Sequence, residues 1–403
     1  MKILMAADTY RPRVNGVVTS IDTFSYEYRK LGHEVTIVAP EYPANQKDFK
    51  DDLDKENEKF VIRLPSRYVF FDPEDRWART HTGEARKIIK EKILTQKFDI
   101  IHSHVPGPLG NAAISWAKSM NCPVINTYHT LFEQYVHYIK IIPRKIGSWL
   151  ARIISRDFCN KHDLIICPST QMKQTLISYG VRKDLPIEVN PTGIKIEKFA
   201  NCDGDAFRQK YGISKDTILL LFMGRIGFEK NIPFLFKMLK RVLKEKPNTK
   251  LIVAGKGPAE SAVQQAAKDE GVFENVIFMG YLESQDWANC YAAADLFTFA
   301  SVTETQGLVV TEAMAARTPV VAIAEMGVAE VMAAGKGGIA TRYDLDEFTD
   351  AVLKMLNDKE LYQKKKAETY DYAKEWSSTA MAIRQLKIYE KAIEIHKTKK
   401  IKG

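Results

Sequence analysis

The most informative segment of this sequence is Ser301-Val302-Thr303-Glu304-Thr305-Gln306-Gly307-Leu308-Val309-Val310-Thr311-Glu312-Ala313-Met314-Ala315. It follows an apolar segment, 295–299, with the length of a buried strand, and its alanine-rich second half predicts a helix. A strand, a polar turn and a helix start bind phosphate well, because backbone N–H groups at a helix N-terminus attract anions. We therefore expect the N–H groups around Gln306, Gly307 and Leu308 to face a phosphate.

Two carboxylates, Glu304 and Glu312, flank this predicted phosphate site. Carboxylates repel phosphate, so we expect them to bind hydroxyl groups on either side of it. A sugar nucleotide has phosphates in the middle and hydroxyl-rich groups at both ends. The alternative is that Glu304 is a solvated loop residue and Glu312 lies on the helix surface. Their place after a predicted strand, where open α/β sheets bind ligands, favours the ligand site.

The spacing of this pair resembles the Glu-x7-Glu motif of family 4 glycosyltransferases, which are retaining enzymes. The resemblance implies an α/β protein of the GT-B fold, with two Rossmann-like domains facing across a cleft. An acceptor-binding domain is expected over 1–193, a nucleotide-sugar-binding domain over 194–375, and a C-terminal helix over 376–403 that packs back on the first domain. In one turn the chain departs from many relatives, because Met326 precedes Gly327 where they have two glycines.

Short apolar segments alternate with helical ones in both halves of the chain, which predicts parallel sheets covered on both faces. The length of 403 residues suits two such domains. In the first half, strands are expected at 3–7, 34–39, 99–103, 124–127 and 164–167. In the second half, they are expected at 217–223, 250–255, 276–279, 295–299 and 320–324.

Composition limits the partners and the compartment. The net charge of +9 indicates an anionic partner, which could be nucleotide phosphates, nucleic acid or an anionic membrane surface. The five cysteines have no paired spacing, which favours a reducing compartment over disulfides or a zinc site. The first residues are too short an apolar run for a signal peptide, and no run has the roughly 20 apolar residues of a membrane span.

A second motif, Gly224-Arg225-Ile226-Gly227-Phe228-Glu229-Lys230-Asn231, follows the predicted strand at 217–223. Two cations beside a helix start suit a diphosphate leaving group. They could also be ordinary surface residues of a loop. The motif matches the family's Gly-Arg-x-x-x-Glu-Lys pattern, and this resemblance implies that Arg225 and Lys230 bind the donor diphosphate.

Two residues of the first half are also candidates for the site. Gly16, near the start of a helical segment, is either a simple turn glycine or a point where a ligand approaches the backbone. His129 follows the strand predicted at 124–127. The resemblance implies that Gly16 lets a backbone amide reach phosphate or acceptor, and that His129 contacts the donor hexose. It also implies that Glu304 holds hexose hydroxyls and Glu312 the ribose.

The segment 139–159 has the pattern of an interfacial helix. Its apolar stripe contains Ile146, Trp149, Leu150, Ile153, Ile154 and Phe158. Together with tryptophan, its basic residues predict membrane contact through Lys140, Arg144, Lys145, Trp149, Arg152 and Arg156. The alternative is a core helix with a solvated basic face. A second candidate contact is 68–71 with Arg67, Arg76, Trp77 and Arg79, which could equally be packed loop.

We therefore expect a hexosyltransferase with His129, Glu304, Arg225 and Lys230 as its catalytic residues. The run 128–138 is similar to that of bacterial diacylglycerol glucosyltransferases, which implies UDP-glucose as donor and a lipid such as diacylglycerol as acceptor. A soluble sugar or lipid-linked oligosaccharide acceptor, or a non-catalytic sugar-nucleotide-binding protein, are the alternatives. No Asp-x-Asp motif stands in the donor site, so we expect no essential metal there. We also expect no further cofactor and no nucleic acid partner. The protein is expected on the cytoplasmic face of the membrane, as a peripheral protein.

Overall fold

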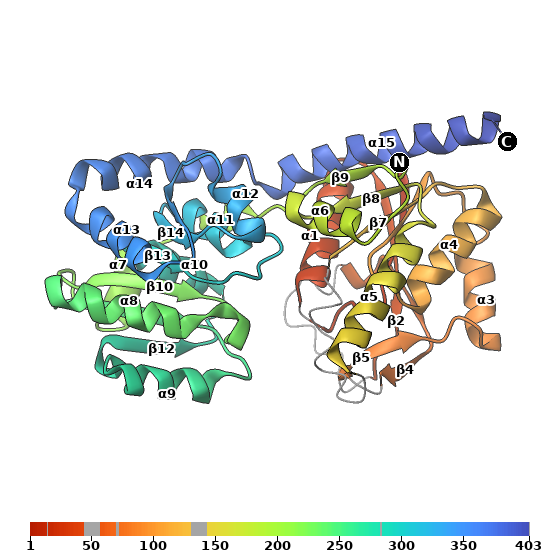
Figure 1. The fold of residues 1–403 in the computed structure, drawn as a ribbon. Helices are drawn as coiled ribbons and strands as arrows, with labels where there is room; N and C mark the ends of the chain where they lie inside the picture. Colours follow the sequence, from red (N-terminus) through yellow and green to blue (C-terminus); the bar gives the residue numbers. More distant parts are fainter. Residues whose placement is uncertain (14, 44–56, 70–71, 130–142, 283, 403) are drawn as a thin grey trace. The chain divides into compact units, whose positions relative to one another are not determined.

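The computed structural model describes residues 1–403 except 14, 44–56, 70–71, 130–142, 283 and 403 (Figure 1). The chain divides into two compact units. Unit 1 contains Met1–Thr192 and Met381–Gly403, and unit 2 contains Gly193–Ala380. Unit 1 thus ends one residue before the expected boundary, and the C-terminal segment joins it from Met381 instead of from residue 376.

Unit 1 is built on a parallel seven-stranded sheet in the order β3-β2-β1-β6-β7-β8-β9. Its strands are β1 (Lys2–Ala6), β2 (Glu34–Pro40), β3 (Val61–Leu64), β6 (Ile100–Ser103), β7 (Val124–Thr127), β8 (Leu164–Cys167) and β9 (Ile187–Val189). The central strands are apolar because helices cover both faces of a parallel sheet. The strand order reverses between β1 and β6, so their carboxyl ends lie side by side.

The helices of unit 1 are α1 (Gly16–Lys30), α3 (Gly83–Lys92), α4 (Pro108–Met120), α5 (Arg144–Cys159), α6 (Thr170–Ser178) and, from Met381 onward, α15 (Ser378–Lys402). An antiparallel hairpin, β4 (Ser66–Val69) and β5 (Asp72–Ala78), lies outside the main sheet. Buried polar contacts attach α15. The Tyr389 hydroxyl lies 2.6 Å from Nδ1 of His102, and Asn190 donates to Gln385 over 2.9 Å.

Unit 2 has a parallel six-stranded sheet in the order β12-β11-β10-β13-β14-β15. Its strands are β10 (Ile218–Met223), β11 (Thr249–Ala254), β12 (Val276–Gly280), β13 (Leu296–Phe299), β14 (Val320–Ile323) and β15 (Gly338–Thr341). Its α-helices are α7 (Gly204–Lys210), α8 (Ile232–Glu245), α9 (Glu260–Glu270), α10 (Ser284–Ala293), α11 (Leu308–Ala315), α12 (Met326–Met332), α13 (Leu345–Asn357) and α14 (Lys359–Lys374). The strand order reverses between β10 and β13.

The predicted α/β class is confirmed, and each strand expected from the sequence is present with ends that differ by at most one residue. The short strands β3, β9 and β15 and the β4–β5 hairpin were not expected. The helix predicted over 139–159 begins at Arg144 in the described chain, after Pro143. Among the described helices, none combines the length and the apolar character needed to cross a membrane.

Candidate active site

The loops that follow β10 and β13 meet at the point where the order of the second sheet reverses. Open α/β sheets bind ligands beyond the carboxyl ends of their strands at such a switch point. The β10 loop carries Arg225 and Lys230, and the β13 loop carries Glu304. Motifs that lie more than 70 residues apart in the sequence are therefore placed together by sheet topology.

Three contacts tie these two loops to each other. The Asn231 side-chain amide donates to the Ala300 carbonyl over 3.2 Å, and the Ser301 hydroxyl donates to the Glu229 carbonyl over 3.3 Å. Lys230 forms an ion pair with Glu304, and their side chains are only 17% and 20% exposed. The structure thus brings two of the predicted site residues into direct contact. The sequence analysis did not identify the contacts of Asn231 and Ser301.

Arg225 is the more accessible of the two predicted cations, with 53% of its side chain exposed. It donates to the Glu229 carboxylate over 2.8 Å. Burial by itself would raise the pKa of Glu229, but hydrogen bonds from its own backbone N–H and from Arg225 lower it overall. Glu229 therefore stays ionised and holds the guanidinium on the β10 loop.

Close backbone packing fixes the shape of this loop. A side chain on Gly255 would place its Cβ 1.9 Å from the Gly224 carbonyl oxygen, and the Gly255 φ of 136° also favours glycine. A Cβ on Gly257 would lie 2.3 Å from the Ile226 carbonyl oxygen. The loops after β10 and β11 therefore pack backbone to backbone. This leaves Arg225 on a rigid support, which an electrostatic site requires.

The turn before α11 has the strand–turn–helix form that was predicted from the sequence. Gly307 precedes the helix with a φ of 67°, and no described side chain caps this helix start. A Cβ on Gly327 would lie 2.4 Å from the Gln306 nitrogen, and the Gly327 N–H donates to the Glu304 carbonyl over 2.8 Å. Gln306, Gly307 and Leu308 thus form the predicted strand–turn–helix junction beside Glu304.

Met326, the residue that departs from the two-glycine pattern, has a φ of 50°. Side chains other than glycine rarely adopt this left-handed conformation. Its side chain is only 7% exposed, so burial offsets the backbone strain. The turn retains the conformation that glycine would favour, and Gly327 lies against Thr305 and Gln306 of the turn before α11.

Glu312 lies four residues into α11 and is partly buried. Its carboxylate accepts a hydrogen bond of 2.8 Å from Tyr291, a fully buried residue of α10. Burial raises the pKa of Glu312 to about 7, although the Tyr291 hydroxyl and the charge of Lys198 act in the opposite direction. Protonated and ionised forms therefore coexist near neutral pH. No pattern in the sequence indicated the Tyr291 contact.

In unit 1, His129 follows β7 and lies against a second histidine. Its Nε2 is 3.1 Å from Nδ1 of His104, which follows the neighbouring strand β6. Burial lowers the pKa of His129 to about 3, and burial followed by the neighbouring imidazoles lowers that of His104 well below its usual range. Both imidazoles are therefore neutral at pH 7. His129 can donate or accept a hydrogen bond there but supplies no positive charge.

The contacts of His104 select a tautomer for this pair. The buried Nε2 of His104 has no hydrogen-bond partner among the described residues. An unpartnered lone pair is tolerated better than an unpartnered buried N–H. His104 then carries its proton on Nδ1 and donates to Nε2 of His129. This arrangement puts the His129 proton on Nδ1, which is then the hydrogen-bond donor of this imidazole.

Gly16 is the first residue of α1, which follows the carboxyl end of β1. The Asn15 side chain caps this helix by accepting from the Val18 N–H over 3.0 Å. A Cβ on Gly16 would meet no atom of the described residues within 4 Å. The packing of the protein therefore does not explain a glycine here, and the ligand-approach hypothesis stays a prediction.

The structure separates the two interpretations of the predicted interfacial helix. In α5, the stripe residues Ile146, Trp149 and Ile154 are 52%, 60% and 58% exposed. Phe158, which was predicted to belong to the same stripe, is instead buried against Gly110, and the Tyr128 hydroxyl donates to Ser155 over 2.8 Å, so the C-terminal end of the helix is anchored in unit 1. The stripe of α5 is therefore not a core face.

The basic residues predicted for this helix have different outcomes. Lys145 and Arg152 are exposed, and Arg156 is half-buried beside Asp157 at 2.9 Å. The side chain of Arg144 lies outside the described residues. Residues 130–142 also lie outside them, and these include Lys140 and most of the run 128–138. Ile146, Trp149, Leu150 and Ile154 are all exposed within one helix, and apolar residues that cluster on a surface in this way mark an interaction site more often than single ones do.

A metal centre in a protein is usually built from several His, Cys, Asp or Glu side chains. Among the residues it describes, no group of three or more His, Cys, Asp or Glu side chains could hold a metal ion. The expectation of a metal-independent site stays a prediction.

Two family models match the chain, one for each half. Residues 14–198 match the model described as Glycosyltransferase Family 4, and residues 203–376 match the one described as Glycosyl transferases group 1. An alpha-monoglucosyldiacylglycerol synthase of Streptococcus pneumoniae is 36% identical over 80% of this chain and 71% of its own length. The enzyme of that name from Acholeplasma laidlawii is 28% identical over 80% of both chains.

Solved structures share the fold at low sequence identity. The Anabaena protein HepE, crystallised with UDP and glucose, has a TM-score of 0.73 at 18% identity, covering 97% of this chain and 100% of its own. A sucrose-phosphate synthase of Thermosynechococcus elongatus has a TM-score of 0.76 at 17% identity, covering 97% and 99%. These likenesses support the GT-B architecture with two Rossmann-like domains.

The raised pKa of Glu312 makes a prediction about stability. The folded chain binds this proton below about pH 7, whereas the unfolded chain binds it only below the ordinary value of 4.5. Ionised Glu312 therefore destabilises the fold above pH 7, and this penalty disappears as the pH falls toward 4.5. When the pH is raised from 5 to 8, the unfolding free energy of the wild type should therefore fall by roughly 1–3 kcal/mol more than that of Glu312→Gln. Denaturant unfolding at both pH values, with exposed Glu360→Gln as control, measures it. An unchanged difference between wild type and Glu312→Gln would contradict the buried-carboxyl account.

Proposed function

This chain belongs to the family 4, group 1 glycosyltransferases of the GT-B fold, and we propose that it transfers glucose from UDP-glucose to the hydroxyl of a membrane lipid, diacylglycerol. The observation that carries the proposal is the cluster of Arg225, Lys230 and Glu304 at the switch point of unit 2, beside the start of α11. The choice of lipid rests on the likeness to monoglucosyldiacylglycerol synthases.

In this proposal the two cations stabilise the leaving group. Charge builds on the diphosphate as the bond between the sugar and phosphate breaks, and fixed cations in a partly buried site stabilise that charge strongly. Lys230 is positioned for this by its largely buried contact with Glu304, and Arg225 by Glu229. The N–H groups of Gln306, Gly307 and Leu308 add the positive end of the α11 dipole.

The carboxylates bind the two hydroxyl-rich ends of the donor. Glu304 accepts hydrogen bonds from hexose hydroxyls, and Glu312 accepts them from the ribose. His129 donates its Nδ1 proton to the hexose as a neutral imidazole, and Gly16 leaves room for phosphate or acceptor to approach the backbone. Support comes from the position of both glutamates on the turn and helix at the sheet edge, and from the low pKa of His129.

The proposed reaction retains the configuration of the sugar. The acceptor hydroxyl attacks the anomeric carbon on the face from which UDP departs. The new carbon–oxygen bond forms as the bond to phosphate breaks, and the departing phosphate oxygen takes the hydroxyl proton. This scheme needs no carboxylate nucleophile, unlike the two-carboxylate retaining hydrolases. It also needs no metal ion or further cofactor, because Arg225, Lys230 and the helix start supply the positive charge.

We place α5 on the cytoplasmic face of an anionic membrane, as a peripheral anchor. Its exposed Ile146, Trp149 and Ile154 would enter the headgroup boundary, flanked by Lys145 and Arg152. The distribution of charge supports this placement. Unit 1 has 35 Lys and Arg against 24 Asp and Glu, a net +11, whereas unit 2 has 24 against 26, a net −2. The excess positive charge therefore does not lie in the nucleotide-binding unit.

The first test removes the phosphate-binding cations. Arg225→Ala and Lys230→Ala should each lower kcat/KM for UDP-glucose by roughly 100-fold or more, because each removes a preorganised charge. Lys237→Ala, an exposed lysine of α8 outside the site, is the matched control and should behave as wild type. Wild-type kinetics in both site variants, with folding verified by circular dichroism, would refute the donor site.

A second test concerns metal removal. Glucosyl transfer should continue at its full rate after extensive dialysis against EDTA, since side chains and the helix start carry the diphosphate charge. The measurement is product formation in metal-free buffer, with and without added Mg²⁺ or Mn²⁺. Loss of activity on chelation that either ion restores would show that the site needs a metal.

A third test concerns the membrane anchor. Each basic residue near an anionic surface contributes on the order of 1 kcal/mol to binding, screened by salt. Lys145→Glu with Arg152→Glu should therefore weaken sedimentation with anionic vesicles at least tenfold without changing the melting temperature. Lys118→Glu with Lys183→Glu, exposed residues elsewhere in unit 1, is the control for total charge. Equal losses in both double variants would show that α5 has no special role.

A further inference from the structure

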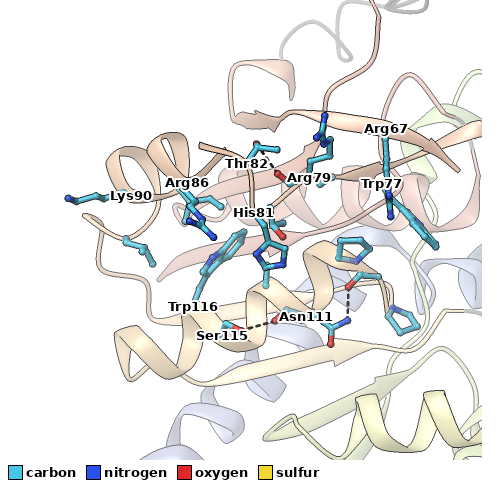
Figure 2. Close-up of a pocket in the computed structure, with 18 residues that line it drawn as sticks. Arg67, Trp77, Arg79, His81, Thr82, Arg86, Lys90, Asn111, Ser115 and Trp116 are labelled. Atoms are coloured by element: carbon cyan, nitrogen blue, oxygen red, sulfur yellow. Dashed lines mark hydrogen bonds between the residues drawn. The ribbon is translucent and has the colours of Figure 1, made fainter. Parts of the chain in front are cut away.

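Unit 1 contains a cavity of about 1140 Å³ whose lining includes none of the candidate active-site residues (Figure 2). It lies between the β4–β5 hairpin, the segment 79–82, α3 and α4. Figure 2 shows His81 and Arg86 on one side of it and Trp116, Asn111 and Ser115 of α4 on the other. The second candidate membrane contact of the sequence analysis contributes Arg67, Trp77 and Arg79 to its wall.

The lining of this cavity carries one sign of charge. Its charged residues are Arg67, Arg79, Arg86 and Lys90, accompanied by His81. None of the described residues that line it is an aspartate or glutamate. The four cations lie on three different elements, so local sequence does not explain why they gather here.

These cations also differ from other arginines of unit 1 in their partners. Arg11 pairs with Asp22 at 2.7 Å, and Arg63 pairs with Glu58 at 2.6 Å. Within the described part of the chain, Arg79, Arg86 and Lys90 form no ion pair, and all three are exposed. Like charges that line one concave surface without acidic partners raise the local concentration of anions.

Apolar and neutral polar groups complete the wall. Trp116 and Ile89 line it with only 6% and 7% of their surfaces exposed, so they form a firm apolar base. The Asn111 amide and the Ser115 hydroxyl donate to carbonyls of their own helix, over 2.9 and 3.3 Å. Their oxygen atoms remain available as acceptors for hydroxyl groups of a ligand.

The start of α4 does not itself provide an anion site here. Asp8 accepts from the Leu109 N–H over 2.9 Å, and its carboxylate lies directly beside Gly107 of the cavity wall. The positive end of this helix is therefore already neutralised. Any anion in the cavity must be held by the arginine and lysine side chains.

We propose that this cavity binds a phosphate ester joined to a glycerol-like or apolar group. Guanidinium groups form paired hydrogen bonds that match the geometry of phosphate oxygens. Several cations together suit a doubly charged phosphate as ligand better than a singly charged carboxylate. The indole and aliphatic base accommodates the carbon skeleton next to the phosphate. The phosphate ester comes either from the headgroup of an anionic phospholipid or from a soluble metabolite.

This ligand is distinct from both proposed substrates. Diacylglycerol has no phosphate, and the site proposed for the UDP diphosphate lies in unit 2. The cavity proposal and the donor-site proposal can therefore be tested separately. A failed cavity test leaves the Arg225 and Lys230 predictions unchanged, and failure of those predictions leaves the cavity unchanged.

The first experiment uses a soluble probe on the full chain. Calorimetric titration with glycerol 3-phosphate at low salt should show saturable binding, and neutral glycerol should show none. Arg86→Gln with Lys90→Gln should weaken this binding at least tenfold. The matched control is Lys87→Gln with Lys118→Gln. These two exposed lysines lie on α3 and α4, the helices of the cavity wall, but their side chains do not line the cavity. Melting temperatures of both double variants verify folding.

The second experiment tests the lipid source. It uses the double variant Lys145→Glu with Arg152→Glu as background, because this variant lacks the proposed α5 anchor. Its binding to pure phosphatidylcholine vesicles is compared with its binding to phosphatidylcholine vesicles that contain phosphatidylglycerol. Phosphatidylglycerol-dependent binding that the cavity variant abolishes identifies a lipid headgroup, whereas binding of glycerol 3-phosphate alone identifies a soluble ester. If neither probe binds, or if the cavity and control variants lose binding equally, the proposal is overturned.

Discussion

The ion pair between Lys230 and Glu304 closes the point where the sheet of unit 2 reverses its order. A parallel sheet that starts in the middle and grows outward in both directions leaves two adjacent strands whose loops diverge. Here Lys230, Asn231 and Ser301 connect those loops with one ion pair and two hydrogen bonds. The same contacts that stabilise the gap between the loops also place a cation and a carboxylate where a sugar nucleotide would need them.

The rigid loops around this point allow its charges to act without reorganisation. At Gly224 and Gly255 the backbones of two loops lie in contact, and any side chain on Gly255 would prevent this contact. Gly327 supports the turn before α11 in the same way, and Met326 maintains the left-handed conformation next to it. Preorganised dipoles and cations stabilise developing charge better than flexible ones, because no energy is spent on aligning them during the reaction. Flexible surface lysines would not provide this.

The sequence allowed the sheet cores and the donor motifs to be predicted, since both depend on local patterns. Strands such as 124–127 are continuous apolar runs, and Glu304 and Glu312 are linked by a fixed spacing on one turn and helix. The contact of Tyr291 with Glu312 could not be predicted in this way, because it depends on how α10 packs against α11. The short strand β9, with a glutamate in its middle, also lacks an apolar run. The His104–His129 contact could have been predicted from one feature of the sequence, because each histidine follows the end of a predicted strand and the two strands are neighbours.

The exposed stripe of α5 and the basic cavity have a common explanation in the charge of unit 1. A helix that only needed to cover the sheet would bury Trp149, since an indole contributes a large apolar area to a core. Instead α5 buries Phe158 and Ser155 and leaves Trp149 60% exposed. A net charge of +11 destabilises a compact unit through repulsion between like charges, and the proposed donor site lies in unit 2 and does not need this charge. An anionic surface that contacts unit 1 would relieve both penalties, because it covers the apolar stripe and neutralises the surrounding cations.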